Sequence, residues 1–203
     1  MRTQTKFIQE NLTPSDAHGI LVEGNKRFAQ NVKAQRNLQE QVFETSKGQY
    51  PFAVVLSCID SRVPAELVFD QGIGDIFSVR VAGNIVNEDI LGSMEYACKV
   101  AGSKIVVVMG HSKCGAVTAA CDNVKLGNIT ALLSKIKPAV DRVEFENNQT
   151  TEKVVEEVCQ INVELSIERI KQESEILSEM EKSGEIEIVG AVYNVTTGLV
   201  QFL

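Results

Sequence analysis

The chain has 203 residues, of which 44% are hydrophobic and 23% are charged, and it carries a formal net charge of −7. This composition is typical of one ordinary globular domain, and an acidic balance without a basic stripe excludes charge-driven binding of nucleic acid. No apolar run approaches the ~18–20 residues that a membrane-spanning helix needs, so we expect no membrane association.

Residues 1–48 form a polar, mainly helical arm. Thr13-Pro14-Ser15 is a helix-start signal, and Leu21, Phe28 and Val32 recur at helical spacing. The first residues lack the apolar core of a signal peptide, which favours a cytoplasmic protein and leaves open only a presequence that has been removed. The arm has too little apolar surface to fold alone, so we expect it to pack on the body or on a neighbouring subunit.

The rest of the chain alternates between apolar strands and helical patterns. The expected strands are 52–57, 76–81, 105–109 and 186–193, followed at 196–203 by a turn into a short edge strand. The expected helices are 88–101, 115–125, 128–140 and 152–172. Continuous apolar strands separated by helices predict an α/β fold, a mainly parallel sheet flanked by helices, in a single domain over residues 1–203.

Two of the expected strands end in residues that bind metals. Cys58 follows the apolar run 52–56, while His111 and Cys114 follow the run 105–110. Sites in open α/β sheets form beyond the carboxyl ends of the strands, so both groups should meet there. Two thiolates and one imidazole suit Zn²⁺, and three protein ligands leave one position open for water or substrate.

Asp60 and Arg62 follow the first ligand, one strand period apart, and can share one side of the strand end. Asp60 can accept a hydrogen bond from a zinc-bound water, or it can bind zinc itself and close the site. Arg62 is placed to hold the carboxylate away from the metal. A closed structural zinc remains the alternative, although no second histidine or spare cysteine lies near either group in the sequence.

The pattern Cys58-x-Asp60-x-Arg62, followed about fifty residues later by His111-x-x-Cys114, resembles the β-class carbonic anhydrases. The stretches 57–66, 80–84 and 110–115 are similar to that family as well. The resemblance implies a zinc enzyme in which zinc-bound hydroxide reversibly hydrates carbon dioxide to bicarbonate and a proton. It also implies that the acid–arginine pair orients the nucleophile. Val55 stands where members with a bicarbonate-regulated closed site carry tryptophan, which favours the plant-type, open active site.

The resemblance also implies a substrate pocket that two chains share. Gln49, nine residues before the first ligand, would bind a substrate oxygen through its amide, and Phe77 and Tyr96 would supply aromatic walls. Gly115 would let the backbone approach the site. The family builds its pocket at a dimer interface, so we expect a homodimer or a higher homo-oligomer.

Three other functions remain open at this point. Relatives with the same ligands hydrolyse carbonyl sulfide or carbon disulfide, and the shape of the pocket separates these activities. A non-catalytic zinc- or bicarbonate-binding protein would not need Asp60, Arg62 and Gln49 together. A thiol redox protein would need a CxxC pair or an activated thiol, whereas Cys98, Cys121 and Cys159 fall in helical patterns typical of small core residues.

Overall fold

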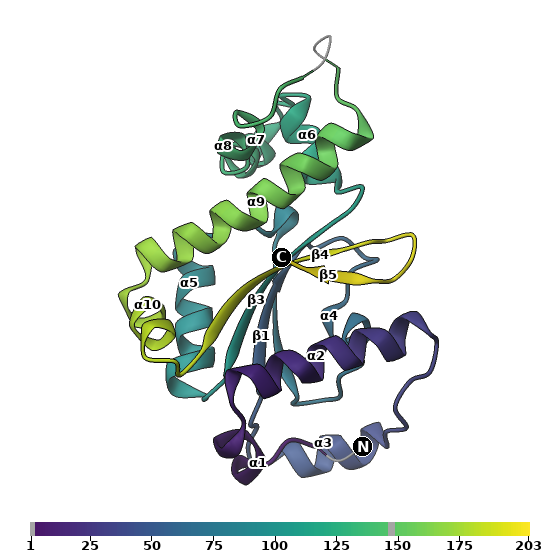
Figure 1. Cartoon of the computed structure of the whole chain (residues 1–203), viewed down its shortest axis with the longest axis vertical. Helices are drawn as coiled ribbons and strands as arrows, with labels where there is room; N and C mark the ends of the chain where they lie inside the picture. The colour runs from purple at the N-terminus through teal and green to yellow at the C-terminus, as the bar shows by residue number, and fades with distance from the viewer. Residues whose placement is uncertain (1–2, 146–148) are drawn as a thin grey trace.

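The computed structural model describes residues 3–145 and 149–203, and a five-stranded sheet runs through its centre (Figure 1). The strands are β1 (Ala53–Ser57), β2 (Ile76–Arg80), β3 (Ile105–His111), β4 (Glu187–Tyr193) and β5 (Val200–Phe202). The first four are parallel, and β5 pairs with β4 in the antiparallel direction. The expected mainly parallel α/β sheet and its short edge strand are therefore confirmed.

The order of the strands, β2-β1-β3-β4-β5, reverses direction next to β1. The chain leaves β1 for β2 on one side and then crosses to β3 on the other side. At such a reversal the connections leave the carboxyl ends of two neighbouring strands in opposite directions, and a crevice remains between them. β1 and β3, which carry the candidate ligands at their ends, are the two strands that flank this crevice.

Helices cover both faces of the sheet. They are α1 (Lys6–Asn11), α2 (Pro14–Ala29), α3 (Leu38–Thr45), α4 (Ala65–Val68), α5 (Glu88–Glu95), α6 (Gly115–Cys121), α7 (Gly127–Leu133), α8 (Lys137–Val140), α9 (Glu152–Glu173) and α10 (Glu175–Lys182). Residues of α2 and α4 share one apolar core with one face of β1 and β3, and residues of α5, α9 and α10 share another with the opposite face. Within the described residues, none of the helices is both long enough and apolar enough to cross a bilayer.

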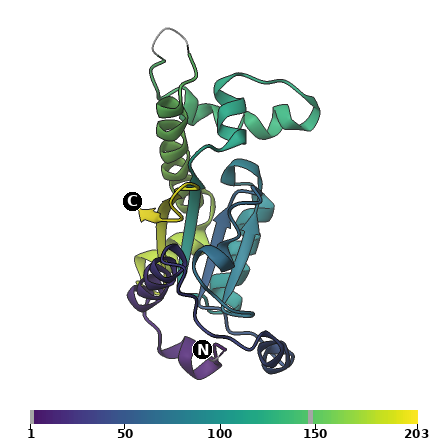
Figure 2. The same cartoon turned by 90° about the vertical axis from the view of Figure 1, so that its right-hand side faces the viewer.

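A third apolar cluster lies beyond the carboxyl ends of the strands. It joins α6, α7, α8 and the first half of α9, which project past the sheet in both views (Figures 1 and 2). Cys58 and Cys114 belong to this cluster and are almost fully buried. The helices therefore form an apolar cover over the open end of the sheet.

Helix α9 lies directly on the backbone of β3 and β4, because two strand positions carry glycine. A Cβ atom at Gly110 would lie 2.8 Å from Cys159 Sγ and 2.9 Å from a methyl carbon of Val163. A Cβ atom at Gly190 would lie 2.9 Å from the other methyl carbon of Val163. Such distances are far below normal contact, so α9 can approach the strands this closely only over glycine.

Several helix boundaries differ from the sequence-based expectation. The helix expected over 115–125 ends at Cys121, because Asn123 adopts a left-handed backbone (φ 53°) of the kind that stops a helix. The helix expected over 128–140 is two helices, and Pro138 lies in the first turn of the second. The helix expected over 88–101 ends at Glu95 and continues as a π-helix over Tyr96–Val100. Helices α4 and α10 were not expected.

The N-terminal arm docks on the body through α2. Thr13 and Asp16 form a reciprocal capping box at its start, as the helix-start signal predicts. Ala17 and Leu21 are fully buried in the core beneath the helix. Val32, which was expected to continue the same helix, lies beyond its end and is 60% exposed.

We expect Leu21→Ala to lower the free energy of unfolding by about 2–5 kcal/mol, because it removes a fully buried side chain and leaves a cavity under α2. Urea unfolding of both proteins measures the difference. Leu126→Ala is the matched control, because Leu126 is 63% exposed and should change stability by less than about 0.5 kcal/mol. Equal losses in the two variants would show that α2 is not anchored as described.

Candidate metal centre

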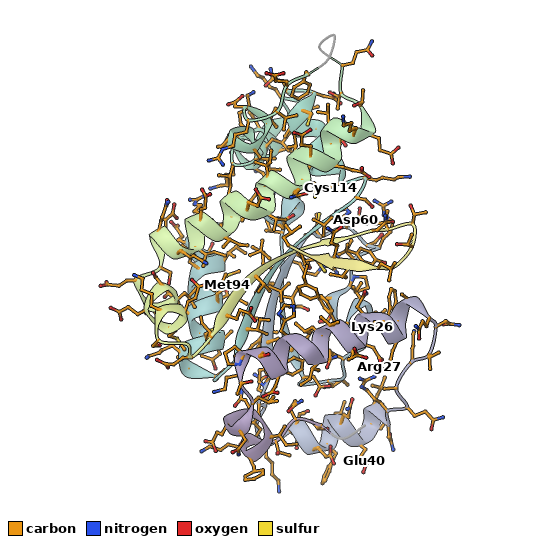
Figure 3. The ribbon with its side chains drawn as sticks, in the orientation of Figure 1. Lys26, Arg27, Glu40, Asp60, Met94 and Cys114 are labelled. Carbon is orange, nitrogen blue, oxygen red and sulfur yellow. The ribbon has the colours of Figure 1, made fainter. Side chains whose placement is uncertain are left out.

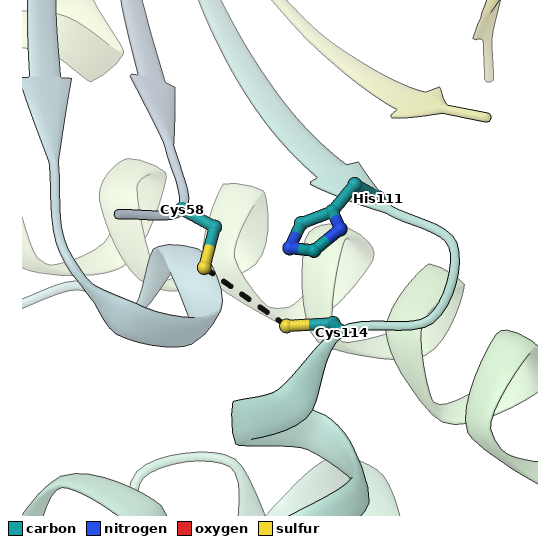
Figure 4. Close-up of side chains that lie close together, drawn as sticks. All are labelled: Cys58, His111 and Cys114. Carbon is teal, nitrogen blue, oxygen red and sulfur yellow. Dashed lines mark hydrogen bonds between the residues drawn. The ribbon is translucent and has the colours of Figure 1, made fainter. Parts of the chain in front are cut away.

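Three side chains converge in the crevice between β1 and β3. Cys58 follows the end of β1, His111 is the last residue of β3, and Cys114 precedes α6 (Figure 4). Their ligand atoms lie within 4.8 Å of one another, and the two sulfur atoms are 4.0 Å apart. All three residues are buried. The structure therefore brings together the three ligands that the sequence predicts.

The orientation of His111 leaves a lone pair directed at this group. Its Nδ1 lies 2.9 Å from the carbonyl oxygen of Ser112 and donates a hydrogen bond to it. The proton therefore resides on Nδ1, and Nε2 carries the lone pair, as in metal-binding histidines whose other nitrogen is held by a carbonyl group. Nε2 is buried without a hydrogen-bond partner among the described residues. Leaving a buried hydrogen-bond acceptor without a partner costs free energy of folding, and a cation bound to Nε2 would supply the missing partner.

A hydrogen bond joins the two sulfur atoms. This contact is the main cause that lowers the pKa of Cys58 to about 4, and together with burial it raises the pKa of Cys114. The backbone N–H of Gly83 also donates to the Cys58 sulfur, at 3.3 Å. Two closely spaced sulfurs and one free imidazole nitrogen form a donor set that suits a soft or borderline divalent cation such as Zn²⁺.

Asp60 lies beside these ligands and is held by Arg62. Arg62 donates from Nε to Asp60 Oδ1 at 2.9 Å and from Nη2 to Oδ2 at 2.7 Å. These hydrogen bonds are the main reason why the pKa of Asp60 lies well below its usual range. Asp60 Oδ2 is 3.9 Å from His111 Nε2, so the carboxylate borders the centre while its two oxygens face the guanidinium. Both carboxylate oxygens of Asp60 therefore accept hydrogen bonds from Arg62.

Arg80 also holds the loop that carries Cys58 and Asp60, and sequence reasoning assigned it no role. It donates from Nε to the Cys58 carbonyl at 3.0 Å and from Nη2 to the Asp60 carbonyl at 2.6 Å. Its position at the carboxyl end of β2, next to β1, was the available signal, because that strand end must border the same crevice. Arg80 fixes the backbone on both sides of Ile59.

Helix α9 supplies two further contacts that sequence reasoning did not find. Asn162 Nδ2 donates to the carbonyl oxygen of Gly83 at 2.9 Å, and Cys159 Sγ donates to the carbonyl oxygen of His111 at 3.3 Å. Gly83 has a left-handed backbone (φ 67°), which glycine adopts without strain. The partners of Asn162 and Cys159 lie 79 and 48 residues away in the sequence, so no local pattern announces them.

Gln49, Phe77 and Tyr96 lie at the other end of the sheet in the same chain. Gln49 and Tyr96 line a cavity of about 380 Å³ beside Gly102 and Lys104, which precede β3. Phe77 packs edge-on against Tyr96, with 6.4 Å between the ring centres. In Figure 3, Asp60 and Cys114 lie on the side of the sheet that faces away from α3 and its Glu40. One chain therefore does not bring these three residues to its own ligands.

Gly115 and the cysteines outside the cluster show no direct contact with the three ligand atoms among the contacts described above. Gly115 is the first residue of α6, and a Cβ atom there would meet no atom within 4 Å, so the structure does not require glycine at this position. Burial raises the pKa of both Cys98 and Cys159 to about 12. Thiols with such pKa values stay protonated at neutral pH, which argues against thiol redox chemistry at these two residues.

Comparisons with protein families, curated sequences and solved structures all find carbonic anhydrases. The family model described as carbonic anhydrase matches residues 53–200. The chain is 35% identical over 199 residues to "Carbonic anhydrase 2" of Mycobacterium tuberculosis, covering 93% of this chain and 92% of that protein. It is 31% identical to a carbonic anhydrase of Mycolicibacterium smegmatis, covering 94% of each. Among solved structures, the β-carbonic anhydrase CafA of Aspergillus fumigatus matches with a TM-score of 0.73 and 26% identity, over 93% of this chain and 89% of that one.

We expect Cys114→Ser to lose most of its bound zinc after dialysis against a weak chelator, because a hydroxyl group is a far poorer ligand than a thiolate. Elemental analysis of the folded protein measures the zinc content per chain. Cys98→Ser is the control, since Cys98 is equally buried but lies outside the cluster. Full zinc occupancy in the Cys114→Ser protein would remove Cys114 from the ligand set.

Proposed function

The chain belongs to the β-class carbonic anhydrase family, and we propose that it is a zinc enzyme that interconverts carbon dioxide and bicarbonate at Cys58, His111 and Cys114. The relatives' carbonate dehydratase activity supports this function. The observation that carries the proposal is the buried cluster of two sulfurs and an unpartnered imidazole nitrogen, with an arginine-held carboxylate at its edge.

The donor set fits Zn²⁺ in charge as well as in geometry. The cation would be held by Cys58 Sγ, Cys114 Sγ and His111 Nε2, and two thiolates would balance its charge beneath the apolar helical cover. When bound, zinc acts as a Lewis acid that lowers the pKa of a water molecule toward neutrality. Because the thiolates weaken that effect, hydrogen bonds from the surrounding protein gain importance.

Asp60 is the residue that orients the attacking water. Its carboxylate stays ionised because Arg62 holds it, and an ionised carboxylate accepts hydrogen bonds only. It would therefore accept a hydrogen bond from the water, which orients a lone pair of the water oxygen toward the carbon of carbon dioxide. Arg62 in turn donates to the carbonyl oxygen of Lys113 at 3.3 Å, which links the carboxylate to the loop between the other two ligands.

A second copy of the chain completes the pocket in this proposal. Gln49, Phe77 and Tyr96 lie far from the ligands of their own chain. Val100 lines the same cavity as Gln49 and Tyr96 and is 70% exposed, and Phe7 of α1 and Phe43 of α3 are each 76% exposed. Burying these side chains between two copies would bring Gln49 of one chain to the centre of the other, where its amide would bind a substrate oxygen. The solved β-carbonic anhydrases of Sordaria macrospora are described as tetrameric.

We expect Asp60→Asn and Arg62→Ala to retain zinc but to lose at least about tenfold in turnover, which corresponds to about 1.4 kcal/mol of activation free energy. Asparagine can donate a hydrogen bond and carries no charge, and alanine releases the carboxylate from its orientation. Stopped-flow hydration of carbon dioxide measures the loss. Glu152→Gln removes an exposed carboxylate and should match the wild type.

Wild-type turnover in both dyad variants would contradict the role of this pair. A zinc-loaded wild-type chain that hydrolyses carbonyl sulfide but does not hydrate carbon dioxide would overturn the proposed activity itself.

We expect a mixture of Gln49→Ala and Cys114→Ser chains, unfolded and refolded together, to regain activity that neither variant has alone. If the glutamine serves the partner's site, each mixed dimer holds one intact site, so activity should reach about one quarter of the wild-type value per chain in a random mixture of two-fold dimers. Hydration assays before and after mixing give the value. No recovery, with mixed dimers present by mass spectrometry, would place Gln49 in the site of its own chain.

A further inference from the structure

Helix α9 crosses behind the metal centre and contacts the backbone next to two of its ligands. Asn162 is only 3% exposed, and its Nδ2 donates to the carbonyl oxygen of Gly83 at 2.9 Å. The N–H of the same glycine donates to Cys58 Sγ at 3.3 Å. A continuous chain of hydrogen bonds therefore leads from the side chain of Asn162 through one residue to a ligand sulfur.

We propose that Asn162 is a positioning residue for the metal centre, which holds the turn at Gly83 so that its N–H points at Cys58 Sγ. The inference rests on the proposed function, because it takes the Cys58 sulfur as a metal ligand. Asn162 touches neither the ligand atoms nor the substrate in this proposal and acts through the glycine.

The turn at Gly83 needs such an anchor. Glycine has no side chain to restrict its rotation, and its left-handed conformation (φ 67°) costs little to leave. Within the turn, the N–H of Asn84 donates to the carbonyl oxygen of Val81 at 3.0 Å. The side-chain amide of Asn84 is buried without a hydrogen-bond partner among the described residues, so it adds no restraint that could replace Asn162.

The position of Asn162 is itself well restrained. Its neighbour Val163 packs against the bare backbone at Gly110 and Gly190, which fixes the distance between α9 and the sheet. One turn earlier on the helix, Cys159 donates to the carbonyl oxygen of His111. The amide of Asn162 therefore reaches Gly83 from a helix that has little freedom to shift.

Replacement of Asn162 is expected to change the environment of the Cys58 sulfur more than the stability of the fold. A thiolate that accepts a hydrogen bond has its lone pairs lowered in energy, so the sulfur-to-metal charge-transfer band of a cobalt-loaded site lies at higher energy. Without the restraint on Gly83, this band should move to longer wavelength. The ligands should also be less well placed for zinc, and loss of such an outer contact typically weakens binding by about 10–100-fold.

The test uses Asn162→Leu in the full-length protein, because leucine matches asparagine in shape but cannot donate a hydrogen bond. Zinc affinity is measured by competition with a chromophoric chelator, and the charge-transfer band is recorded after loading with Co²⁺. Ser166→Ala, one turn further along α9 at a site that is 6% exposed, is the control for a small change in the same helix. If Asn162→Leu does not fold, Asn162→Ser, whose hydroxyl group is too short to reach the carbonyl, replaces it.

We expect about tenfold weaker zinc binding and a red-shifted cobalt band in the Asn162 variant, with wild-type values for Ser166→Ala. Unchanged affinity and an unchanged band in a folded Asn162 variant would overturn the inference, even if the variant unfolds at lower urea concentration. A wild-type protein that binds neither zinc nor cobalt at this cluster would instead overturn the proposed function. The two failures are therefore distinct.

Discussion

The reversal of strand order beside β1 is the constraint on which the rest of the molecule depends. It leaves the carboxyl ends of β1 and β3 side by side and free of the connections that would otherwise fill the space between them. Cys58, His111 and Cys114 occupy this gap, and α6, α7 and α8 cover it from beyond the sheet. The site is thus built where parallel strands end, and its apolar cover comes from helices that lie between β3 and β4 in the chain.

Negative charge is concentrated in this gap, and the surrounding groups are arranged to hold it. Two sulfurs and the Asp60 carboxylate lie close together, and Arg62 pairs with the carboxylate directly. Arg80 acts on the same loop through carbonyl oxygens, so it fixes geometry while it adds positive charge nearby. The arginines donate to the carboxylate and to backbone carbonyl oxygens, so they do not neutralise the two sulfurs. A divalent cation would supply the positive charge that balances them.

The sequence predicts the sheet, and it predicts that Cys58, His111 and Cys114 come together, because both depend on local patterns. An apolar run marks each strand, so Cys58 after the first run and His111 after the second must lie at the carboxyl ends of their strands. The helical pattern over 128–140 does not show the break before α8, although Pro138 is a signal for it, because proline is common in a first helical turn. Asn162 could not be found in this way, because its contact with Gly83 depends on how a distant helix crosses the sheet.

The two glycines under α9 bear on how this protein can change over evolution or under engineering. In most proteins an alanine introduced into a buried strand is a matter of packing and overall stability alone. At Gly110 the added carbon would press on Cys159 and Val163, the helix positions that adjoin Asn162 and the backbone of His111. A substitution at either strand position would therefore shift α9 and affect the packing of the core and the geometry of the site at the same time. Core stability and the arrangement of the site cannot change independently at these positions.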